Sequence, residues 1–401
     1  MSEEKLRIGV IGLGRAFTLM LPSFVNDRRV ELVAAADPLP GPRARFAADF
    51  ACKTYRDAAE LCRDADVEIV YIASPHQFHA AHAEMAAANG KHILVEKPMA
   101  LSLSECRRMI AYASNAKVQL VVGHSHSFDA PILRTREHIA GGKLGSLRMI
   151  QMLNFTDFLY RARRPDELDT AQGGGVVFSQ AVHQLDIARL LGGGKVKSVR
   201  AITGAWDGRR RTEGAYAALL EFECGAFASL TYSGYAHFDS DEFCGWIGES
   251  GKLKDPADYG GARKSLVNLS AEEEAALKAS RNYGGQNYAE PNTTGIDPKD
   301  VPPHHQHFGF VLAACDRADL RPLPNGVMIY GDQEQYFDKL PKPIVPRVEV
   351  IDELCRAILD GAEPQHSGRW SMATMEVCHA LLTSAKWNRQ VILSEQVGIG
   401  E

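Results

Sequence analysis

The chain of 401 residues is long enough for two or three domains, and 45% of its residues are hydrophobic while 24% are charged. A net charge of -5 gives no electrostatic reason to expect nucleic acid or an anionic membrane as a partner. We find no apolar signal region after Met1 and no apolar run long enough to cross a bilayer. The eight cysteines form no C-x-x-C pair, which is typical of the reducing cytoplasm.

The chain begins with a strand, a glycine turn and a helix. The strand is predicted over Leu6 to Ile11, and Gly12-Leu13-Gly14 and Arg15-Ala16-Phe17 follow it. This is most of a dinucleotide-binding fingerprint: Gly12 permits the turn, and Gly14 lets a pyrophosphate approach the helix amino terminus. Phe17 replaces the third glycine, so we expect the helix to lie further from the sheet. A glycine turn without a ligand is the alternative.

The second strand, Val30 to Ala36, ends at Asp37. An acid at this distance from the glycine turn is expected to bind the adenosine ribose hydroxyls, and its charge would repel a 2′-phosphate. The sequence therefore favours NAD over NADP as the cofactor, although Arg43 and Arg45 lie near enough in sequence to bind a phosphate.

Strands and helices alternate up to residue 123, which predicts a doubly wound parallel sheet, a Rossmann domain, over residues 1–123. Helices are expected to begin after Asp57 and after Ser102, where acids three residues later complete capping boxes. Open sheets of this kind bind ligands at the carboxyl ends of their strands. We therefore expect Ser74-Pro75-His76 and Glu96-Lys97 to line the cofactor site with the glycine turn. The remaining strands are predicted at Glu68 to Ala73, around His92 to Val95 and at Val118 to Val122, and a further helix at Phe78 to Asn89.

Lys97 ends a short apolar run that is bounded by Gly90 and Pro98. The run predicts a buried strand, in which a lysine is expected only at the end. Pro98 restricts Lys97 to extended backbone, so the ammonium is aimed into the cleft. We predict that Lys97 points at the reacting atom of a substrate on a nicotinamide ring. A surface lysine at a strand end is the alternative.

After residue 123 strands begin to follow each other directly. This predicts a second domain over residues 124–401, with a mostly antiparallel open sheet and helices on one face. The uncovered face needs a partner, so we expect a homodimer or homotetramer through this sheet. A Gly-, Pro- and Asn-rich excursion over residues 248–303 has no predicted role. Helices are expected at 131–140, 176–191, 347–359 and 371–388, and strands at 147–155, 196–204, 215–223, 226–235, 308–314 and 327–330.

Together these motifs resemble those of the Gfo/Idh/MocA-family oxidoreductases along nearly the whole chain. The resemblance implies hydride transfer with NAD or NADP, and it implies Lys97 and His183 as the catalytic pair. We place His124 and Ser179 at the substrate site. The motifs are Gly12-Leu13-Gly14, Ser74-Pro75-His76 with His79, Glu96-Lys97-Pro98, Gly123-His124, and Gly173-Gly174-Gly175 running to His183 and Asp186.

One position departs from the family pattern. Many members have an acid four residues before the catalytic histidine, where this chain has Ser179. A serine cannot stabilise an imidazolium as a carboxylate does, so we expect a substrate other than the usual polyols and sugars. Residues 173–183, 234–242 and 305–309 resemble a narrower branch, the cis-dihydrodiol dehydrogenases of aromatic carboxylate breakdown.

Alcohol oxidation requires a base for the hydroxyl proton, a cation near the developing alkoxide and a hydride acceptor. His183 suits the first task because an imidazole titrates near neutral pH. Lys97 suits the second, but a nicotinium charge nearby would lower its pKa, so it could also be the base. The sequence leaves both assignments open. A His183 that only packs against the sheet is the alternative.

A carboxylated substrate requires cations, and guanidinium groups match carboxylates bidentately. Arg161, Arg163 and Arg164, in a basic loop before the catalytic helix, are the candidates, and a solvated basic turn is the alternative. We also weighed a metal site at His304, His305 and His307, with Asp239, Asp241 or Glu242 as further ligands. Nicotinamide chemistry needs no metal, so we predict none.

We therefore predict a cytoplasmic, NAD-dependent dehydrogenase with a small anionic substrate. Its expected reaction is oxidation of a carboxylated cis-dihydrodiol, of the phthalate 4,5 type, to the catechol. The alternatives are a sugar or inositol (polyol) dehydrogenase of the same family and a non-catalytic nicotinamide-nucleotide sensor. The presence of both Lys97 and His183 argues against the sensor, which needs neither.

Overall fold

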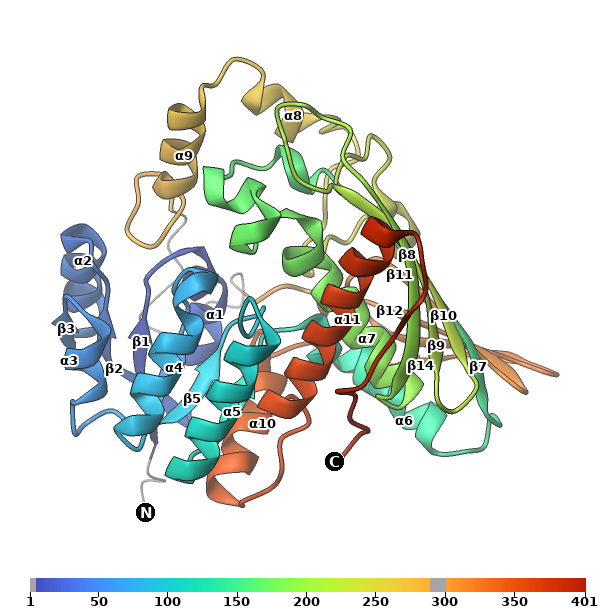
Figure 1. Cartoon of the computed structure of the whole chain (residues 1–401), viewed down its shortest axis with the longest axis horizontal. Coiled ribbons are helices and arrows are strands. Elements are labelled where there is room, and N and C mark those ends of the chain that lie inside the picture. Colours follow the sequence, from blue (N-terminus) through green and yellow to red (C-terminus); the bar gives the residue numbers. More distant parts are fainter. Residues whose placement is uncertain (1–4, 289–300) are drawn as a thin grey trace.

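The structure is a computed structural model that describes residues 5–288 and 301–401. It contains two sheets with helices packed against both (Figure 1). The first sheet is parallel and the second mostly antiparallel, which confirms the predicted fold class. Within the described residues no helix combines the length and the apolar character needed to cross a membrane.

The first sheet has six parallel strands in the order β3-β2-β1-β4-β5-β6, the doubly wound arrangement. Helix α2 and strand β3 were not predicted, because α2 buries only Phe46 and shows no apolar periodicity, and β3 has only three residues. The strands are β1 (Leu6–Ile11), β2 (Val30–Ala36), β3 (Lys53–Tyr55), β4 (Ile69–Ile72), β5 (His92–Val95) and β6 (Leu120–Val122). The helices are α1 (Arg15–Asn26), α2 (Pro40–Phe50), α3 (Ala58–Cys62), η1 (His76–Phe78), α4 (His79–Ala88) and α5 (Leu103–Ala116).

The second sheet has nine strands in the order β14-β13-β12-β11-β7-β10-β9-β8-β15. Only β7 and β10 pair in parallel. Three of the strands, β12, β14 and β15, were not predicted. The strands are β7 (Leu147–Phe155), β8 (Val196–Gly204), β9 (Ala215–Phe222), β10 (Phe227–Ser233), β11 (Phe310–Cys315), β12 (Ala318–Leu323), β13 (Gly326–Gly331), β14 (Gln335–Lys339) and β15 (Val391–Ile392).

Helices α6, α7 and α11 contact this sheet, as predicted for one of its faces. A π-helical turn, η6, leads directly into α7, so the two form one continuous helical segment. The helices are η2 (His126–Phe128), α6 (Ala130–Ala140), η3 (Phe158–Tyr160), η4 (Pro165–Leu168), η5 (Thr170–Gln172), η6 (Val177–Ala181), α7 (Val182–Gly192), η7 (Ser240–Cys244), α8 (Gly261–Leu266), α9 (Ala271–Ser280), α10 (Val348–Leu359) and α11 (Gly368–Trp387).

Two late segments return to the first domain. Helix α10 buries Val350, Ile351 and Leu354 in the same core as Ile8 and Phe24 of the first domain. Helix α11 contacts α5 on one side and β8 on the other. A single boundary at residue 123 therefore puts α10 in the second domain, although its apolar face is buried in the core of the first. Sequence order could not reveal this, because an amphipathic helix does not specify which sheet will cover it.

The predicted excursion over residues 248–303 contains two helices, α8 and α9, rather than only loop. The Ser270 hydroxyl accepts from the Glu273 backbone N–H, and the Glu273 carboxylate accepts from the Ser270 backbone N–H. Helix α9 therefore begins with a capping box. Residues 289–300 of this excursion lie outside the described residues.

Candidate active site

A cleft of about 540 Å³ runs along the carboxyl ends of the first sheet's strands. Both domains line it, and it includes most residues predicted to bind the cofactor. Those from the first domain are Gly12, Gly14, Arg15, Ala16, Asp37, Ser74, Pro75 and His76, while the second contributes Phe158, Arg163, Arg164, Gly173, Gly174, Ser179, Lys278 and Asn282 among others.

The glycine turn is shaped for a ligand with backbone contacts. Gly12 has a φ of +94°, and a Cβ there would meet the Ala73 carbonyl oxygen at 2.8 Å. A Cβ on Gly14 would meet nothing within 4 Å, so the space in front of it is open. No side chain caps α1 at Gly14, which leaves the helix amino terminus able to bind an anion.

Asp37 is buried at the end of β2, beside the glycine turn. Its two carboxylate oxygens accept from the backbone N–H groups of Leu13 (2.8 Å) and Leu39 (2.9 Å). The two arginines that could have bound a phosphate are occupied: Arg43 donates to the Asp37 carbonyl oxygen (2.6 Å), and Arg45 pairs with Asp49 (2.8 Å). This arrangement suits the ribose of NAD and disfavours a 2′-phosphate.

Ser74 and His76 lie at the end of β4, next to the Lys97 turn. His79 connects the two turns, since its ring nitrogens lie 2.9 Å from the carbonyl oxygens of Ser74 and Pro98. Burial lowers the pKa of His76 to about 3, so this ring is neutral in the cleft.

Lys97 extends from the end of β5 towards the second domain. Its Nζ donates to the backbone carbonyl oxygen of Ser179 (2.9 Å), four residues before His183 in the helical segment. Burial lowers the pKa of Lys97 to about 8, although the nearby Glu96 opposes the shift. Neither Lys97 nor Glu96 is among the residues that line the cleft: Lys97 contacts Ser179, which lines it, and Glu96 turns inward to accept from the Tyr71 hydroxyl (2.6 Å).

His183 lies within the electrostatic reach of Lys97, so the two domains bring the predicted pair together. Burial, and then the charge of Lys97, lower the pKa of His183 well below its ordinary value. The backbone N–H of His126 donates to His183 Nδ1 (3.4 Å). A neutral ring whose Nδ1 accepts carries its hydrogen on Nε2, which makes Nε2 a donor.

Ser179 acts through its backbone rather than its side chain. Its hydroxyl donates to the Gly175 carbonyl oxygen, whereas its own carbonyl oxygen accepts from Lys97. The acid that many family members carry at this position would project from the same turn. Here the position contributes a backbone carbonyl oxygen to Lys97 and no carboxylate.

His124 belongs to a buried group with His126 and Asp129. Asp129 contacts both rings, His124 Nε2 at 3.2 Å and His126 Nδ1 at 2.7 Å. Burial alone would raise the pKa of Asp129, but His126 and His124 hold it well below its usual range. The ligating atoms lie within 4.8 Å of one another, a separation that could hold a metal ion. This group was overlooked in the sequence, although the motif His-x-His-x-x-Asp directly after a strand could have indicated it.

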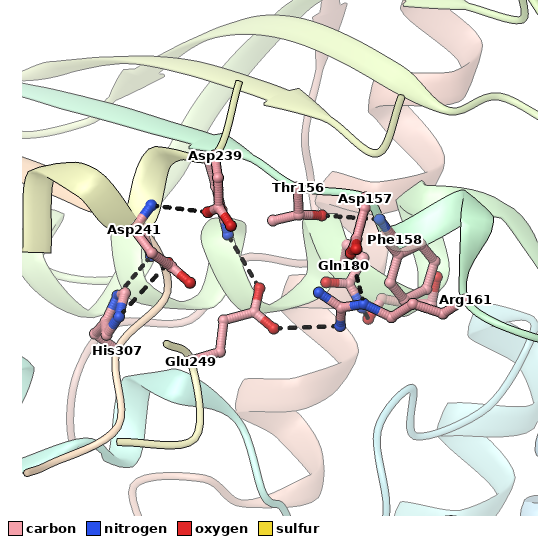
Figure 2. A network of polar contacts seen from close by, with 12 residues as sticks. Thr156, Asp157, Phe158, Arg161, Gln180, Asp239, Asp241, Glu249 and His307 are labelled. Carbon is pink, nitrogen blue, oxygen red and sulfur yellow. Dashed lines mark hydrogen bonds and ion pairs between the residues drawn. The ribbon is translucent and has the colours of Figure 1, made fainter. Parts of the chain in front are cut away.

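The three arginines of the basic loop have different surroundings. Arg161 pairs with Asp157 (3.0 Å) and with Glu249 (3.6 Å), and these two carboxylates raise its pKa although burial opposes them. Figure 2 shows Glu249 pointing towards Arg161, with Asp241 and His307 on its other side. Nothing in the sequence pattern indicated that Glu249, from the excursion, would lie here.

Arg163 and Arg164 both line the cleft, and the side chain of Arg163 is the less exposed of the two, at 11%. The Arg163 guanidinium stacks 3.7 Å above the Phe158 ring, and its Nε has no hydrogen-bond partner among the described residues. Burial lowers the pKa of Arg163 to about 10. Arg164 instead makes two hydrogen bonds to the Asp166 carboxylate (3.0 and 2.9 Å), and its side chain is 40% exposed.

His304, His305 and His307 do not converge on one point. Their ring nitrogens contact the Asn325 side chain (2.6 Å), the Pro341 carbonyl oxygen (2.8 Å) and the Ile247 carbonyl oxygen (2.7 Å), respectively. His307 lies 3.7 Å from Asp241, and Lys254 also pairs with that carboxylate, so the acids near it have protein partners.

Two family models match the chain. Residues 6–124 match the oxidoreductase family with an NAD-binding Rossmann fold, and residues 132–254 match the C-terminal domain of the same family. The chain belongs to the Gfo/Idh/MocA family of oxidoreductases.

Similar proteins agree with the assignment. The chain is 49% identical, over 95% of both proteins, to 1-carboxy-3-chloro-3,4-dihydroxycyclohexa-1,5-diene dehydrogenase of Comamonas testosteroni. It is 26% identical to myo-inositol 2-dehydrogenase of Thermotoga maritima, over 62% of this chain and 74% of that protein. A solved dehydrogenase structure from Bordetella bronchiseptica RB50 is 41% identical, with a TM-score of 0.89 over 97% of this chain and 100% of that one.

As a Gfo/Idh/MocA enzyme, the chain has an NAD-binding first domain, and the cleft fits that cofactor. The open space before Gly14 admits a pyrophosphate, and Asp37 lies where the adenosine ribose would bind. The sequence had not singled out Arg347, whose side chain, at the start of α10, acts electrostatically on Glu96, Lys97 and His183. No local sequence pattern could link Arg347 to this site, because it lies 250 residues after Lys97 in the chain.

Proposed function

We propose that this enzyme oxidises a carboxylated cis-dihydrodiol, of the phthalate 4,5-cis-dihydrodiol type, to the corresponding catechol with NAD. One observation carries the proposal. Lys97 hydrogen-bonds the helical segment four residues before His183 and acts electrostatically on that ring, in a chain 49% identical to a dehydrogenase of a carboxylated dihydroxycyclohexadiene. Bound NAD would supply the acceptor for the hydride.

Within this proposal Lys97 is the base and His183 the hydrogen-bond donor. An amine with a pKa of about 8 is partly neutral at physiological pH and can accept a hydroxyl proton. His183 is a weak base because its pKa is well below its usual value, and the His126 N–H on Nδ1 leaves Nε2 as a donor. Nε2–H would then stabilise the oxygen as negative charge develops on it.

The substrate class supplies the driving force. Loss of a hydride from one carbinol carbon and a proton from its hydroxyl leaves a hydroxy-ketone. The neighbouring carbinol carbon then loses its hydrogen as a proton, the ketone oxygen gains one, and the ring becomes a catechol. Aromatisation makes the overall step effectively irreversible, which a polyol substrate would not provide.

Arg163 is the group of the basic loop best placed to bind a substrate carboxylate. Its side chain is 11% exposed, its Nε has no hydrogen-bond partner among the described residues, and its charge is felt at Lys97. Its other contacts are weaker than those of the two neighbours: Nη2 donates to the Phe158 carbonyl oxygen (3.0 Å), and Nη1 lies 3.8 Å from Glu167. Arg161 is already held between Asp157 and Glu249, and Arg164 is held by Asp166. We keep all three as candidates and expect the largest contribution from Arg163.

A substrate screen tests the proposal. Purified enzyme with NAD is offered phthalate 4,5-cis-dihydrodiol, a monocarboxylated cis-dihydrodiol and a panel that includes inositols and sugars, and NADH absorbance is followed. We expect turnover with the carboxylated dihydrodiols. Turnover of only inositols or sugars would favour the polyol alternative, which the 26% identical inositol dehydrogenase supports. Binding of NAD with no turnover of any compound would favour the sensor.

The same proposal includes a homo-oligomer and a cytoplasmic location. One face of the second sheet leaves Ile202 (67%), Leu219 (53%) and Phe227 (46%) exposed on three adjacent strands. A second copy of this chain, paired face to face, would cover these side chains. A monomer across a wide concentration range in light scattering would contradict the oligomer. The eight free cysteines are consistent with the cytoplasm.

A further inference from the structure

Residues 261–288 pass from the second domain over the nucleotide cleft to the first domain (Figure 1). We call this segment the strap. Its end in the second domain is anchored by Glu274 of α9, which is buried. Glu274 Oε1 accepts from Arg210 Nη1 and from the Arg163 backbone N–H, both at 2.7 Å. The strap is thus attached to the loop that carries the substrate-site arginines.

Tyr283 attaches the other end of the strap to the first domain. Its side chain is 1% exposed and belongs to the first domain's core. The ring lies edge-on to Phe17, with centroids 5.2 Å apart, and 6.3 Å from Phe46, and its hydroxyl donates to Asp49. Phe17 stands where the fingerprint's third glycine would be. The replacement of the third glycine by Phe17 therefore has a structural role, because Tyr283 of the strap packs on the Phe17 ring.

Between these anchors, Lys278 and Asn282 line the same cleft as Gly14 and Asp37. Lys278 lies in the last turn of α9, and its side chain is 15% exposed. Among the described residues its hydrogen-bond partner is Glu167. An ammonium has three N–H donors, so the bond to Glu167 leaves two others. Burial and the charge of Arg163 lower the pKa of Lys278 to about 8, while Glu167 opposes this shift. In its protonated form, a lysine in this wall complements the negative charge of a pyrophosphate.

We propose that the strap forms the outer wall of the NAD site. Lys278 donates to the pyrophosphate of bound NAD, Asn282 completes the wall, and the packing of Tyr283 on Phe17 keeps both in place. The cofactor then leaves only after Tyr283 has separated from the first domain. The strap therefore slows NAD dissociation without touching the reacting atoms.

The rate of NADH dissociation and its Kd, both from nicotinamide fluorescence, test this inference without any substrate. Lys278→Ala should raise the Kd about tenfold, as expected for loss of a hydrogen bond to a charged group. Tyr283→Ala should raise the dissociation rate about tenfold, and Tyr283→Phe, which keeps the ring, should recover most of the slow dissociation. Lys264→Ala, on α8 of the same strap but bonded to the Tyr259 carbonyl oxygen, is the control.

Hydrogen exchange gives a second measurement. We expect the amides of residues 271–288 to gain protection when NADH binds the wild-type protein, and to gain less in Lys278→Ala. If Tyr283→Ala does not fold, Lys278→Ala and the exchange data decide. A Kd and dissociation rate for Lys278→Ala within twofold of wild type, with no added protection of the strap, would overturn the inference. Failure of the proposed substrate would leave these binding results unaffected.

Discussion

The two sides of the cleft position their groups in different ways. On the first domain's side, Gly12 and Asp37 line the cleft just after parallel strands, and Lys97 follows β5 in the same way, so the backbone of the sheet places them. On the second domain's side, Arg164 and Lys278 are held by other charged side chains, Asp166 and Glu167. The main chain therefore positions the groups on the first side, whereas ion pairs between side chains position those on the second.

This difference has energetic consequences. Removing a group placed by a strand end removes its chemistry and leaves the frame in place. Removing one member of an ion pair leaves its partner without compensation, and the penalty is expected to be larger for Lys278, whose side chain is 15% exposed, than for Arg164, at 40%. Substitutions on the second side are therefore expected to combine functional loss with local rearrangement.

The largest effect is expected for Lys97→Ala. If Lys97 is the base, kcat should fall by about a thousandfold, within the range for general acid–base catalysis. Since the strand end and glycine turn are unchanged, the Kd for NADH should stay within a few-fold of wild type. Steady-state kinetics and fluorescence titration measure the two quantities. An unaltered kcat would remove Lys97 from the mechanism.

The pH dependence should follow the same group. The pKa of Lys97 is about 8, and only the neutral amine accepts a proton. The value of kcat/KM should therefore rise about tenfold per pH unit below pH 8 and level off above it. A profile that is already flat between pH 6.5 and 8 would instead indicate a base with a lower pKa, such as the His183 imidazole.

The arginine pair offers a matched comparison on the second side. Arg163→Gln should raise KM for a carboxylated dihydrodiol by about tenfold to a hundredfold, as for loss of a charge-assisted hydrogen bond. Arg164 is the next residue in the loop but is paired with Asp166, so Arg164→Gln should change KM by less than about threefold. Equal effects of the two substitutions would contradict the assignment of Arg163.

Cofactor preference should depend on Asp37. Asp37→Asn keeps the shape and removes the charge, so discrimination against NADP should fall by about tenfold. The ratio of kcat/KM for NAD and NADP is the measurement. Because Asp37 also accepts from Leu13 and Leu39, a thermal melt is needed to show that the turn is intact. An unchanged ratio would show that other groups select the cofactor.

The smallest effect is expected from metal removal. In the His124, His126 and Asp129 group the carboxylate already contacts both rings, and the proposed chemistry requires no Lewis acid. Exhaustive chelation should leave kcat within twofold of the untreated enzyme. Loss of activity that Zn²⁺ or another divalent ion restores would instead identify this group as a metal site.

Much of the first domain could be predicted from the sequence. Strands β1 and β2 begin and end where their apolar patterns indicated, and helix α1 begins at Arg15, directly after the glycine turn, as predicted. The capping box at Ser102 and Glu105 was also correct. Helix α2 and strand β3 were missed, because neither has the periodic burial on which such a prediction depends.

The second side of the cleft was harder to predict. The loop arginines Arg161, Arg163 and Arg164 were predicted, and Asp157 and Asp166 are local partners, but Glu249, the second partner of Arg161, comes from a distant segment. The strap was predicted only as an excursion, although Tyr283 becomes part of the first domain's core. A local pattern cannot indicate such contacts, because they depend on which surfaces the rest of the chain leaves open.

By itself, the sequence determined where the strands end and which chemical groups stand at those ends. Short-range sterics and apolar periodicity act within a few residues, so Gly12, Asp37 and Lys97 carry their information locally. Only the tertiary structure decided that the Ser179 carbonyl receives Lys97, that His126 orients His183, and that Tyr283 packs on Phe17. These contacts join residues between 57 and 266 positions apart, and they form only when both sheets and the strap pack together.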